Sequence, residues 1–420
     1  MSTMLQSQVI ERLLKYARVN TRSLQAMPGE ELPHPSSPEQ VVLIDLLLSE
    51  LSDMGVPSNW TRKLEDASFL IEIPATEGHE NAPHVVLAAH VDTYFGCPGG
   101  ANPIIHEYQG GDIALPNDNV VIPASDLAGL EGKGIITADG TTLLGGDDKC
   151  GVAAIMTFIE SMLAHNLPHG PLTIWICTDE EVGEVGVKFL PSGTAEKWDF
   201  FWTVDGERLE VVDIGCFYGS SVDVEFIGND SHPGVSGHSL KPAHYAACRF
   251  VDQLGLAPTP WRTSGEESFI YVPSLPACTA GKSTIKVFPR TFRQEEIPEM
   301  RETIRLVAEE AASHYGVQAV VSEAKILYVS TEVAIDQNRH LLQPGLDAIR
   351  KFWVEPKLHR VRAGTDGAML NMTYPKIPSP NMGAGARNLH GVREFVVREE
   401  LQLVPEIISE MIGIYATMSR

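Results

Sequence analysis

The sequence of 420 residues predicts an α/β fold into which a smaller α+β domain is inserted. Two observations carry this prediction. Buried-strand patterns alternate with helical patterns through the first half of the chain, which favours a sheet with helices on its faces. From about residue 217 the pattern changes to half-exposed strands, and long helices return after about residue 330. The length, at about 150 residues per domain, agrees with two or three domains.

The first part of the chain begins with two expected helices. Apolar residues recur at helical spacing over 4–18. A second helix starts at Ser37-Pro38, an N-cap followed by proline at the first helical position, and runs to Gly55. After these, we expect strands at 68–74, 84–91, 172–178 and 200–204, and a helix at 150–165. Residues 99–135 are rich in Gly, Pro, Asp and Asn and predict a long loop with a hairpin.

The middle of the chain predicts the smaller domain. Ser220–Gly228 alternates polar and apolar residues, as a strand with one exposed face does. Helices are expected near 240–254 and 295–315, followed by a strand near 317–328. Residues 331–420 predict long helices around a short strand region rich in Pro and Gly, Ile377–Gly385.

The composition excludes several classes of partner. The chain has 32 Lys and Arg against 55 Asp and Glu, a net charge of −23, so phosphate backbones and anionic membranes should repel it. No segment approaches the roughly 20 apolar residues that span a membrane. The six cysteines lie far apart without a C-x-x-C pair, which favours reduced, structural thiols and a cytoplasmic protein. The acidity itself has two explanations: solubility, or carboxylates gathered to hold cations.

Polar residues gather at the ends of the predicted strands. The carboxyl ends of strands are where α/β sheets bind ligands. Each motif has an ordinary explanation by itself: a histidine satisfied near a loop, aspartates capping a helix, or a solvated acidic loop. The motifs are HVD at 90–92, GGDDK at 145–149, TDEEVG at 178–183, VDGE at 204–207, GTDG at 364–367 and NLHG at 388–391.

Taken together, these motifs predict a hydrolytic site with two metal ions. They supply two histidines and several carboxylates, the ligands that Zn²⁺ accepts. Two ions about 3.5–4 Å apart need a bridging carboxylate and activate a shared water. The adjacent Glu180 and Glu181 repel each other unless a proton or cation intervenes, so one can bind metal while the other moves a proton.

In this order the motifs resemble one known family. HVDT (90–93), GGDDKCG (145–151), TDEEVG (178–183), TVDGE (203–207), SHPG (231–234), GTDGA (364–368) and NLHG (388–391) are similar to the peptidase T group of the co-catalytic zinc peptidase clan, which includes carboxypeptidase G and aminoacylases. YQGGDIAL (108–115) and ITADGTTLLGGDDK (136–149) resemble peptidase T in particular. The resemblance runs almost end to end. It implies a mixed-sheet, three-layer zinc-peptidase domain at 1–216 and 330–420, with a lid or substrate-binding domain at 217–329 that closes over the substrate.

The resemblance also implies a role for each matching residue. His90 and Asp205 would bind one ion, Glu181 and His390 the other, and Asp147 would bridge the two. Of the catalytic pair, Glu180 would be the general base and Asp92 would orient His90. The ions would be two Zn²⁺, with Co²⁺ and Mn²⁺ as alternatives. Three ligand carboxylates against two Zn²⁺ leave one positive charge, which a bound hydroxide neutralises.

The implied substrate contacts are less uniform. His232 would stabilise the oxyanion of the reaction intermediate. Arg290 would bind the C-terminal carboxylate of the peptide, since arginine is a bidentate donor. The ordinary alternative for Arg290 is a surface salt bridge. Arg362 and Asn388 are further candidates for the same pocket. The chain departs from the family where Pro242 stands near an expected Asn and where RTFR at 290–293 replaces R-D-F-D. These departures leave the preferred peptide length and side chains open.

The expected function is that of a metal-dependent aminopeptidase. It would release the N-terminal residue of short peptides, tripeptides first, through a metal-bridging hydroxide. The expected partner is a small peptide, not nucleic acid or a membrane, and a homodimer is a candidate assembly. Two alternatives stay open: another amidohydrolase of the clan (a dipeptidase, acylase or carboxypeptidase), and a non-catalytic metal-binding protein, against which Glu180 argues.

Overall fold

The computed structural model describes residues 2–26, 31–117, 119–275, 278–352 and 354–420 and divides the chain into two compact units. The first, called here the large unit, comprises Met1–Gly215, Thr331–His359 and Thr365–Arg420. The second, the inserted unit, comprises Cys216–Ser330 with Arg360–Gly364. The inserted unit extends one residue beyond each of the limits expected from the sequence, 217 and 329, and also takes in Arg360–Gly364.

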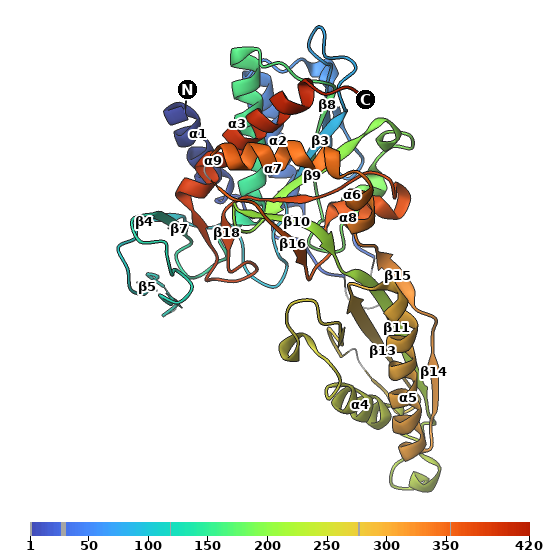
Figure 1. The fold of residues 1–420 in the computed structure, drawn as a ribbon. Coiled ribbons are helices and arrows are strands. Elements are labelled where there is room, and N and C mark those ends of the chain that lie inside the picture. The colour runs from blue at the N-terminus through green and yellow to red at the C-terminus, as the bar shows by residue number, and fades with distance from the viewer. Residues whose placement is uncertain (1, 27–30, 118, 276–277, 353) are drawn as a thin grey trace. The chain divides into compact units, whose positions relative to one another are not determined.

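The large unit is built on one mixed sheet (Figure 1). Its centre is parallel, since β3 pairs in parallel with β8 and β9, and β17 pairs in parallel with β9. β1, β2 and β10 join it by antiparallel pairing. The order is β1 (Thr61–Lys63), β2 (Phe69–Ile73), β8 (Leu172–Cys177), β3 (Val85–His90), β9 (Phe200–Gly206), β17 (Asn381–Gly383), β10 (Val211–Cys216) and β16 (Lys357–Val361). The predicted α/β fold class is confirmed.

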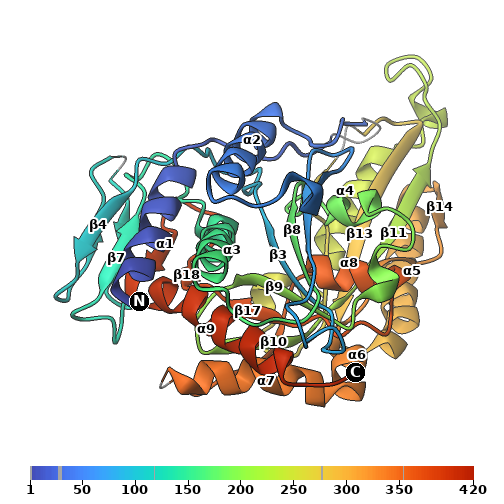
Figure 2. The same ribbon diagram turned by 90° about the horizontal axis from the view of Figure 1, so that it is seen from above.

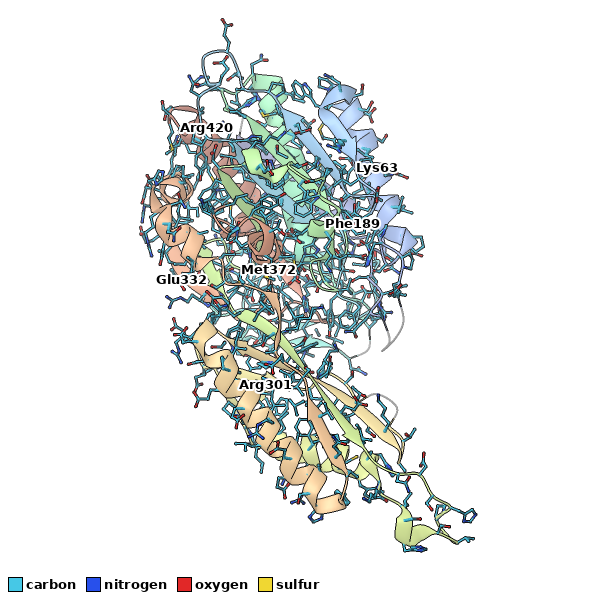
Figure 3. The ribbon with its side chains drawn as sticks, turned by 90° about the vertical axis from the view of Figure 1, so that its right-hand side faces the viewer. Lys63, Phe189, Arg301, Glu332, Met372 and Arg420 are labelled. Carbon is cyan, nitrogen blue, oxygen red and sulfur yellow. The ribbon has the colours of Figure 1, made fainter. Side chains whose placement is uncertain are left out.

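The central strands are mainly apolar because both faces of the sheet are buried. In β3, Leu87 and Ala89 face one apolar cluster while Val86 and Ala88 face another. Figure 2 shows the two covering layers on opposite sides of β3 and β8. One layer contains α1 (Ser2–Tyr16), α2 (Pro38–Asp53), α3 (Gly146–His165), α7 (Arg339–Lys351) and α9 (Arg398–Ala416), and the other contains α8 (Asp366–Thr373), which Met372 marks in Figure 3.

Two details of the helices differ from expectation. Ser37 occupies the N-cap of α2, but its hydroxyl makes no capping bond and instead accepts a hydrogen bond from Gln40 Nε2 at 3.3 Å. The helix expected from residue 150 already begins at Gly146, with non-helical backbone at Asp147 and Asp148. That irregular first turn follows Gly145, which adopts the left-handed conformation that glycine favours.

The segment expected to be a long loop with a hairpin contains more structure than that. β5 (Ile113–Ala114) and β6 (Val121–Ile122) form the hairpin. β4 (Ile104–Glu107) pairs with β7 (Gly134–Thr137), which in turn pairs with a strand from near the C-terminus. The resulting four-stranded sheet has the order β18 (Ala386–Arg387), β19 (Phe395–Val397), β7 and β4. It brings the 388–391 motif close to the start of α3.

The inserted unit has its own sheet and its own core. Its strands are β12 (Phe269–Tyr271), β13 (Lys282–Thr291), β11 (Tyr218–Ile227), β14 (Gln318–Val321) and β15 (Lys325–Tyr328), the last of which also pairs with β11. The helices α4 (Ala243–Leu254) and α5 (Ile297–Tyr315), the latter marked by Arg301 in Figure 3, pack on this sheet. The strand expected near 317–328 is two strands, and β13 was not expected. Within the described part of the chain, the search for membrane-spanning helices finds none.

Candidate metal centre

The topology brings the predicted strand-end residues together. His90 is the last residue of β3 and lies opposite Cys177, the last residue of β8, so the Glu180–Glu181 turn follows directly beside it. Asp205 lies near the end of β9, the other parallel neighbour of β3. Because parallel strands end at the same edge of a sheet, three separate motifs converge there.

Asp147 lies between the two histidines. Its Oδ1 is 3.1 Å from His90 Nε2, and its Oδ2 is 3.0 Å from His390 Nε2. Each carboxylate oxygen therefore faces a different imidazole, although the two histidines are far apart in sequence. This is the arrangement expected of a bridging carboxylate.

Each histidine also has a carboxylate of its own. Asp205 Oδ1 is 3.5 Å from His90 Nε2, and Glu181 Oε1 is 3.1 Å from His390 Nε2. The site thus consists of two half-sites that share Asp147. They differ in exposure, since the His90 side chain is 2% exposed and the His390 side chain 44%.

Asp92 holds the acidic turn as well as the histidine. Its carboxylate oxygens accept hydrogen bonds from the backbone N–H of Glu180 at 3.0 Å and of Glu181 at 3.1 Å. His90 Nδ1 lies 3.0 Å from the Asp92 main-chain oxygen and 3.4 Å from its Oδ1. Asp92 therefore fixes one histidine and two glutamates at once, and acts by positioning them.

Glu180 lies beside the half-sites, with its Oε2 4.0 Å from His90 Nε2. Burial raises the pKa of this carboxyl well above its ordinary value. A carboxyl with a raised pKa accepts and returns a proton more readily near neutral pH, as a general base requires.

Three further acidic residues support the site, and the sequence analysis assigned no role to any of them. Glu394 is buried, and its two oxygens accept the backbone N–H groups of Gly145 at 2.8 Å and Asp147 at 3.0 Å. It thereby fixes the irregular turn that carries the bridging carboxylate. The available signal in the sequence was an acidic residue four positions after His390, directly before the apolar run Phe395–Val397.

Asp148 is the second of these residues. It is fully buried and accepts hydrogen bonds from the backbone N–H of His90 at 3.3 Å and of Gly151 at 3.0 Å. One of its oxygens also lies close enough to His90 and Asp205 for the three to share an ion. Sequence reasoning treated the DD pair as one motif and assigned a role only to Asp147.

Asp179, the third, ties the acidic turn to the start of α2. It adopts a left-handed conformation with φ of 56°. Its carboxylate accepts hydrogen bonds from the Ser36 backbone N–H at 2.7 Å, the Ser36 hydroxyl at 2.6 Å and Gln40 Nε2 at 2.7 Å. These bonds hold in place a backbone conformation that an aspartate seldom adopts.

The electrostatics of the site reflect crowded carboxylates. Burial, and then the charge of Asp147, raise the pKa of Glu181 to about 7, and the same two causes raise that of Asp205 to about 7. In contrast, hydrogen bonds with His390 and His90 outweigh burial and lower the pKa of Asp147. Although burial opposes it, Asp147 and Glu181 raise the pKa of His390 to about 11.

This donor set fits two divalent cations. Buried carboxylates that raise one another's pKa are costly unless positive charge lies among them. Imidazole nitrogen and carboxylate oxygen are ligands that Zn²⁺ and other first-row divalent ions accept. His90, Asp147 and Glu181 place one ligand atom each within 4.8 Å of one another, and His90, Asp148 and Asp205 do the same.

The residues expected to contact substrate are distributed over both units. Asn388, in the large unit, donates from Nδ2 to Asp126 at 2.9 Å. The other three belong to the inserted unit. His232 is exposed and accepts the Val235 backbone N–H at 3.1 Å. Arg362 donates to the main-chain oxygens of Gly265 and Glu267, both at 2.8 Å, so its guanidinium is engaged by its own unit.

A comparison with known families places the chain in one of them. The model of the peptidase family M20/M25/M40 matches residues 133–413 of the chain. The chain belongs to this family. Peptidase T from Clostridium perfringens, a relative, is 30% identical over 413 residues, which cover 97% of this chain and 99% of the relative. The resemblance to the peptidase T group is confirmed.

Solved structures show the same fold for this M20/M25/M40 chain. An aminopeptidase PepT from Bacillus cereus matches with a TM-score of 0.71 and 20% identity, covering 98% of this chain and 99% of that one. A dinuclear metal-binding peptidase of the M20 family from Bacillus subtilis matches with a TM-score of 0.63 and 14% identity, covering 98% of both chains. Both matches extend over the large and the inserted units.

Proposed function

We propose that this chain is a metal-dependent aminopeptidase that releases the N-terminal residue of short peptides, with tripeptides as the preferred length. Membership of the M20/M25/M40 family supports a peptidase. The names of its relatives, peptidase T and aminopeptidase PepT, support the aminopeptidase assignment. The resemblance to peptidase T, a tripeptide aminopeptidase group, supports the peptide length.

One observation carries the proposal: the two oxygens of Asp147 face the two imidazoles, and Glu180 lies within 4.0 Å of one of them. His90, Asp147, Asp205, Glu181 and His390 would hold two divalent ions, with Zn²⁺ as the proposed metal. When bound, such ions supply charge that polarises a peptide carbonyl and favours ionisation of a water molecule.

The protein's own groups do the remaining work. Glu180 takes a proton from the attacking water on its carboxylate and returns it to the leaving amine. Asp92, which holds the backbone of Glu180 and Glu181, keeps the base at a fixed place relative to His90. In the inserted unit, we propose that His232 donates to the oxyanion and that Arg290 pairs with the peptide's C-terminal carboxylate.

The test is an assay of the metal-reconstituted enzyme on free di-, tri- and tetrapeptides, with an N-blocked tripeptide as the control. We expect release of the N-terminal residue from the free tripeptide and none from the blocked one. Hydrolysis of the blocked peptide alone would instead identify an acylase or carboxypeptidase of the same clan. Binding of two ions without turnover of any of these peptides would favour the non-catalytic alternative.

The remaining expectations accompany this proposal. We expect Zn²⁺ as the metal, with Co²⁺ and Mn²⁺ as alternatives. Reconstituting the metal-free chain with each ion in turn and measuring peptide hydrolysis distinguishes them. A cytoplasmic location and a homodimer stay predictions. So does the exclusion of nucleic acid and membranes as partners, which rests on the net charge of −23.

A further inference from the structure

The two histidines of the metal centre are oriented in different ways. His90 Nδ1 lies 3.0 Å from the main-chain oxygen of Asp92, so a hydrogen bond fixes the direction of its ring. Proteins usually orient a metal-binding histidine in this way, through the ring nitrogen that does not face the metal. Within the described part of the chain, the polar contacts of His390 are both made by Nε2, with Asp147 and Glu181, and Nδ1 has none.

The ring of Tyr94 lies flat on the imidazole of His390. The two ring centres are 4.4 Å apart, and the ring planes differ by 5°. The His390 side chain is 44% exposed, and an exposed side chain changes rotamer rapidly unless a neighbour holds it. The aromatic stack therefore takes the orienting role that the Asp92 oxygen has for His90.

Tyr94 is itself held in place by its own segment. The residue before it, Thr93, donates its backbone N–H to the Thr21 oxygen at 3.1 Å and accepts the Ser23 backbone N–H at 3.0 Å. The Tyr94 ring also lies over Gly96, where a Cβ atom would come within 2.4 Å of the ring. Glycine at this position therefore leaves the space that the stacked ring occupies.

His90, Asp92 and Tyr94 are alternate residues of one short segment at the end of β3. His90 is a proposed ligand of the buried half-site, and Asp92 accepts the backbone N–H groups of Glu180 and Glu181. Tyr94 contacts the histidine of the other half-site. This segment thus acts on both halves of the metal centre, and the function derived above uses only its first two residues.

The loop that carries His390 has further supports. Asn388 and His390 have φ values of 55° and 66°, a conformation that is uncommon for residues other than glycine. Asn388 Nδ2 donates to Asp126 Oδ2 at 2.9 Å, which ties the loop to the segment between β6 and β7. Leu389, between them, packs against the main apolar core of the large unit. The loop is therefore held at three consecutive residues.

We propose that Tyr94 and Asp126 are positioning residues for the exposed half-site, that of His390 and Glu181, and that they set the affinity of its metal ion. Tyr94 fixes the plane of the imidazole, and Asp126 fixes the loop that carries it. This inference rests on the two-ion centre of the proposed function. Because the buried half-site does not share these contacts, the two ions should respond differently when they are removed.

Metal binding to the metal-free chain tests the role of Tyr94. Competition with a chromophoric chelator for Zn²⁺ measures one affinity for each ion. Tyr94→Leu keeps much of the bulk but removes the flat ring, and it should weaken one ion about tenfold, as for other residues that orient metal ligands, and leave the second within about twofold. Tyr94→Phe keeps the ring and should match the parent. Tyr245→Leu, the same change at an exposed tyrosine of α4, is the matched control.

A His390→Ala background identifies the ion that responds. This variant should retain only the ion of His90 and Asp205. Adding Tyr94→Leu to it should leave the affinity for that ion unchanged, because both changes act through the same contact. A further loss of affinity in the double variant would show that Tyr94 supports the whole centre or the fold, and would overturn the inference.

Asp126 is tested by the same competition. Asp126→Ala removes the acceptor of Asn388 and should weaken the ion that Tyr94→Leu weakens. Asp126→Asn keeps an acceptor oxygen and should restore most of the lost affinity. Asp53→Ala, at an exposed aspartate that ends α2, is the matched control. Parent affinity for both ions in Asp126→Ala would overturn the part of the proposal that concerns Asp126.

Peptide assays on the same preparations separate this inference from the proposed function. If Tyr94→Leu binds both ions as tightly as the parent while the parent cleaves tripeptides, the inference is wrong and the proposed function stands. If Tyr94→Leu weakens one ion as expected while the parent cleaves no peptide, the inference stands and the proposed function is wrong.

Discussion

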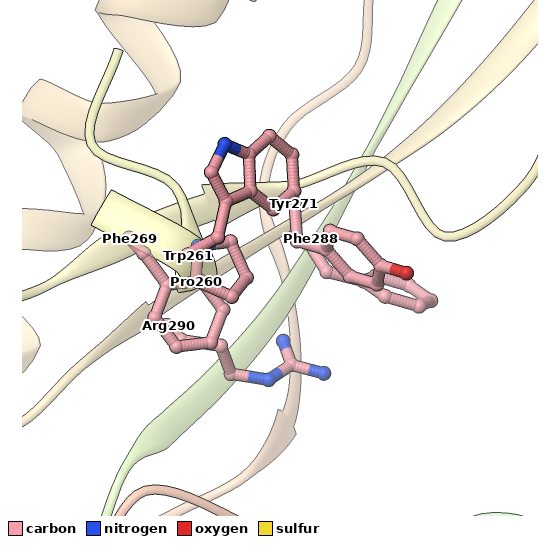
Figure 4. Close-up of a pocket in the computed structure, with 6 residues that line it drawn as sticks. All are labelled: Pro260, Trp261, Phe269, Tyr271, Phe288 and Arg290. Atoms are coloured by element: carbon pink, nitrogen blue, oxygen red, sulfur yellow. The ribbon is translucent and has the colours of Figure 1, made fainter. Parts of the chain in front are cut away.

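The metal centre of the large unit and a pocket of the inserted unit are built in opposite ways. The residues that line this pocket are Pro260, Trp261, Phe269, Tyr271, Phe288 and Arg290 (Figure 4). In the large unit, backbone N–H groups and imidazoles hold the site carboxylates, and Glu394 fixes the turn of Asp147 by accepting two backbone N–H groups. In the inserted unit, the pocket is lined mainly by aromatic rings, and Trp261 is largely exposed. Bond cleavage requires polar atoms at fixed positions, whereas an apolar group requires only an apolar surface of suitable shape.

The largest effect should come from removing the shared carboxylate. Asp147→Ala should reduce bound metal from two ions per chain to less than one and abolish turnover, because both half-sites use this residue. His390→Ala should retain one ion, since His90 and Asp205 remain. Metal analysis after dialysis measures both, and His238→Ala, an exposed histidine of the inserted unit, is the control. Retention of two ions by Asp147→Ala would show that Asp147 does not bridge.

Replacement of the general base should separate chemistry from metal binding. Glu180→Gln should lower kcat by about 10²–10⁴-fold, the range of general acid–base contributions, with two ions still bound. Metal analysis and tripeptide turnover on one preparation check this. Glu77→Gln, which neutralises an exposed glutamate of the large unit, should match the parent enzyme. Full activity of Glu180→Gln would contradict the assigned role.

A smaller loss of metal affinity and activity is expected for Glu394, which acts only through the residues that it positions. Glu394→Gln keeps the shape of the side chain but weakens its hold on the Gly145–Asp147 turn. We expect about 10–100-fold weaker metal binding, as for residues that orient metal ligands, and a lower kcat with little change in KM. Chelator competition measures the affinity, and exposed Glu355→Gln is the control. Unchanged metal affinity would limit Glu394 to a structural role.

The smallest expected effect is on folding stability, and it concerns His84, which belongs to neither site. Burial lowers the pKa of His84 to about 4, below the value of about 6.5 for an unfolded histidine. As the pH falls, His84 therefore binds a proton in the unfolded chain before it does so in the folded chain. Its contribution to the free energy of unfolding is fully present above pH 6.5 and is lost as the pH falls toward 4. Between pH 7 and pH 5, the free energy of unfolding should decrease by about 2 kcal/mol.

Urea unfolding of the metal-free chain tests this prediction. Between pH 7 and pH 5, the free energy of unfolding of the parent should fall by about 2 kcal/mol more than that of His84→Gln. His84→Gln also disturbs the contact of His84 Nε2 with the Thr173 hydroxyl, 2.8 Å away, so only the pH-dependent difference is compared. His340→Gln, an exposed histidine on α7, should follow the parent. Equal pH dependence of His84→Gln and the parent would rule out this linkage.

The contrast between the two regions also explains how much of each could be predicted from the sequence. His90, Glu181 and Asp205 stand at or soon after the ends of mainly apolar strands, so local pattern together with the rule of strand ends indicates their convergence. Asp179 and Glu394 escape this reasoning because their partners, Ser36 and Gly145, are distant in sequence. The pocket escapes it because β13 was not expected and the β12–β13 register decides which side chains share a face. Likewise, β7 pairs with β19, more than 250 residues further on, which no local pattern reveals.

The order of the site residues along the chain, in which His390 and Glu394 come last, has a consequence for biosynthesis. A ribosome that has made the first 380 residues has already released the strands that carry His90, Glu181 and Asp205. The second imidazole and the acid that orders the Asp147 turn are still to come. The nascent chain therefore lacks the complete set of proposed metal ligands until the segment with His390 and Glu394 has left the ribosome. Binding of the second ion would have to wait for that segment.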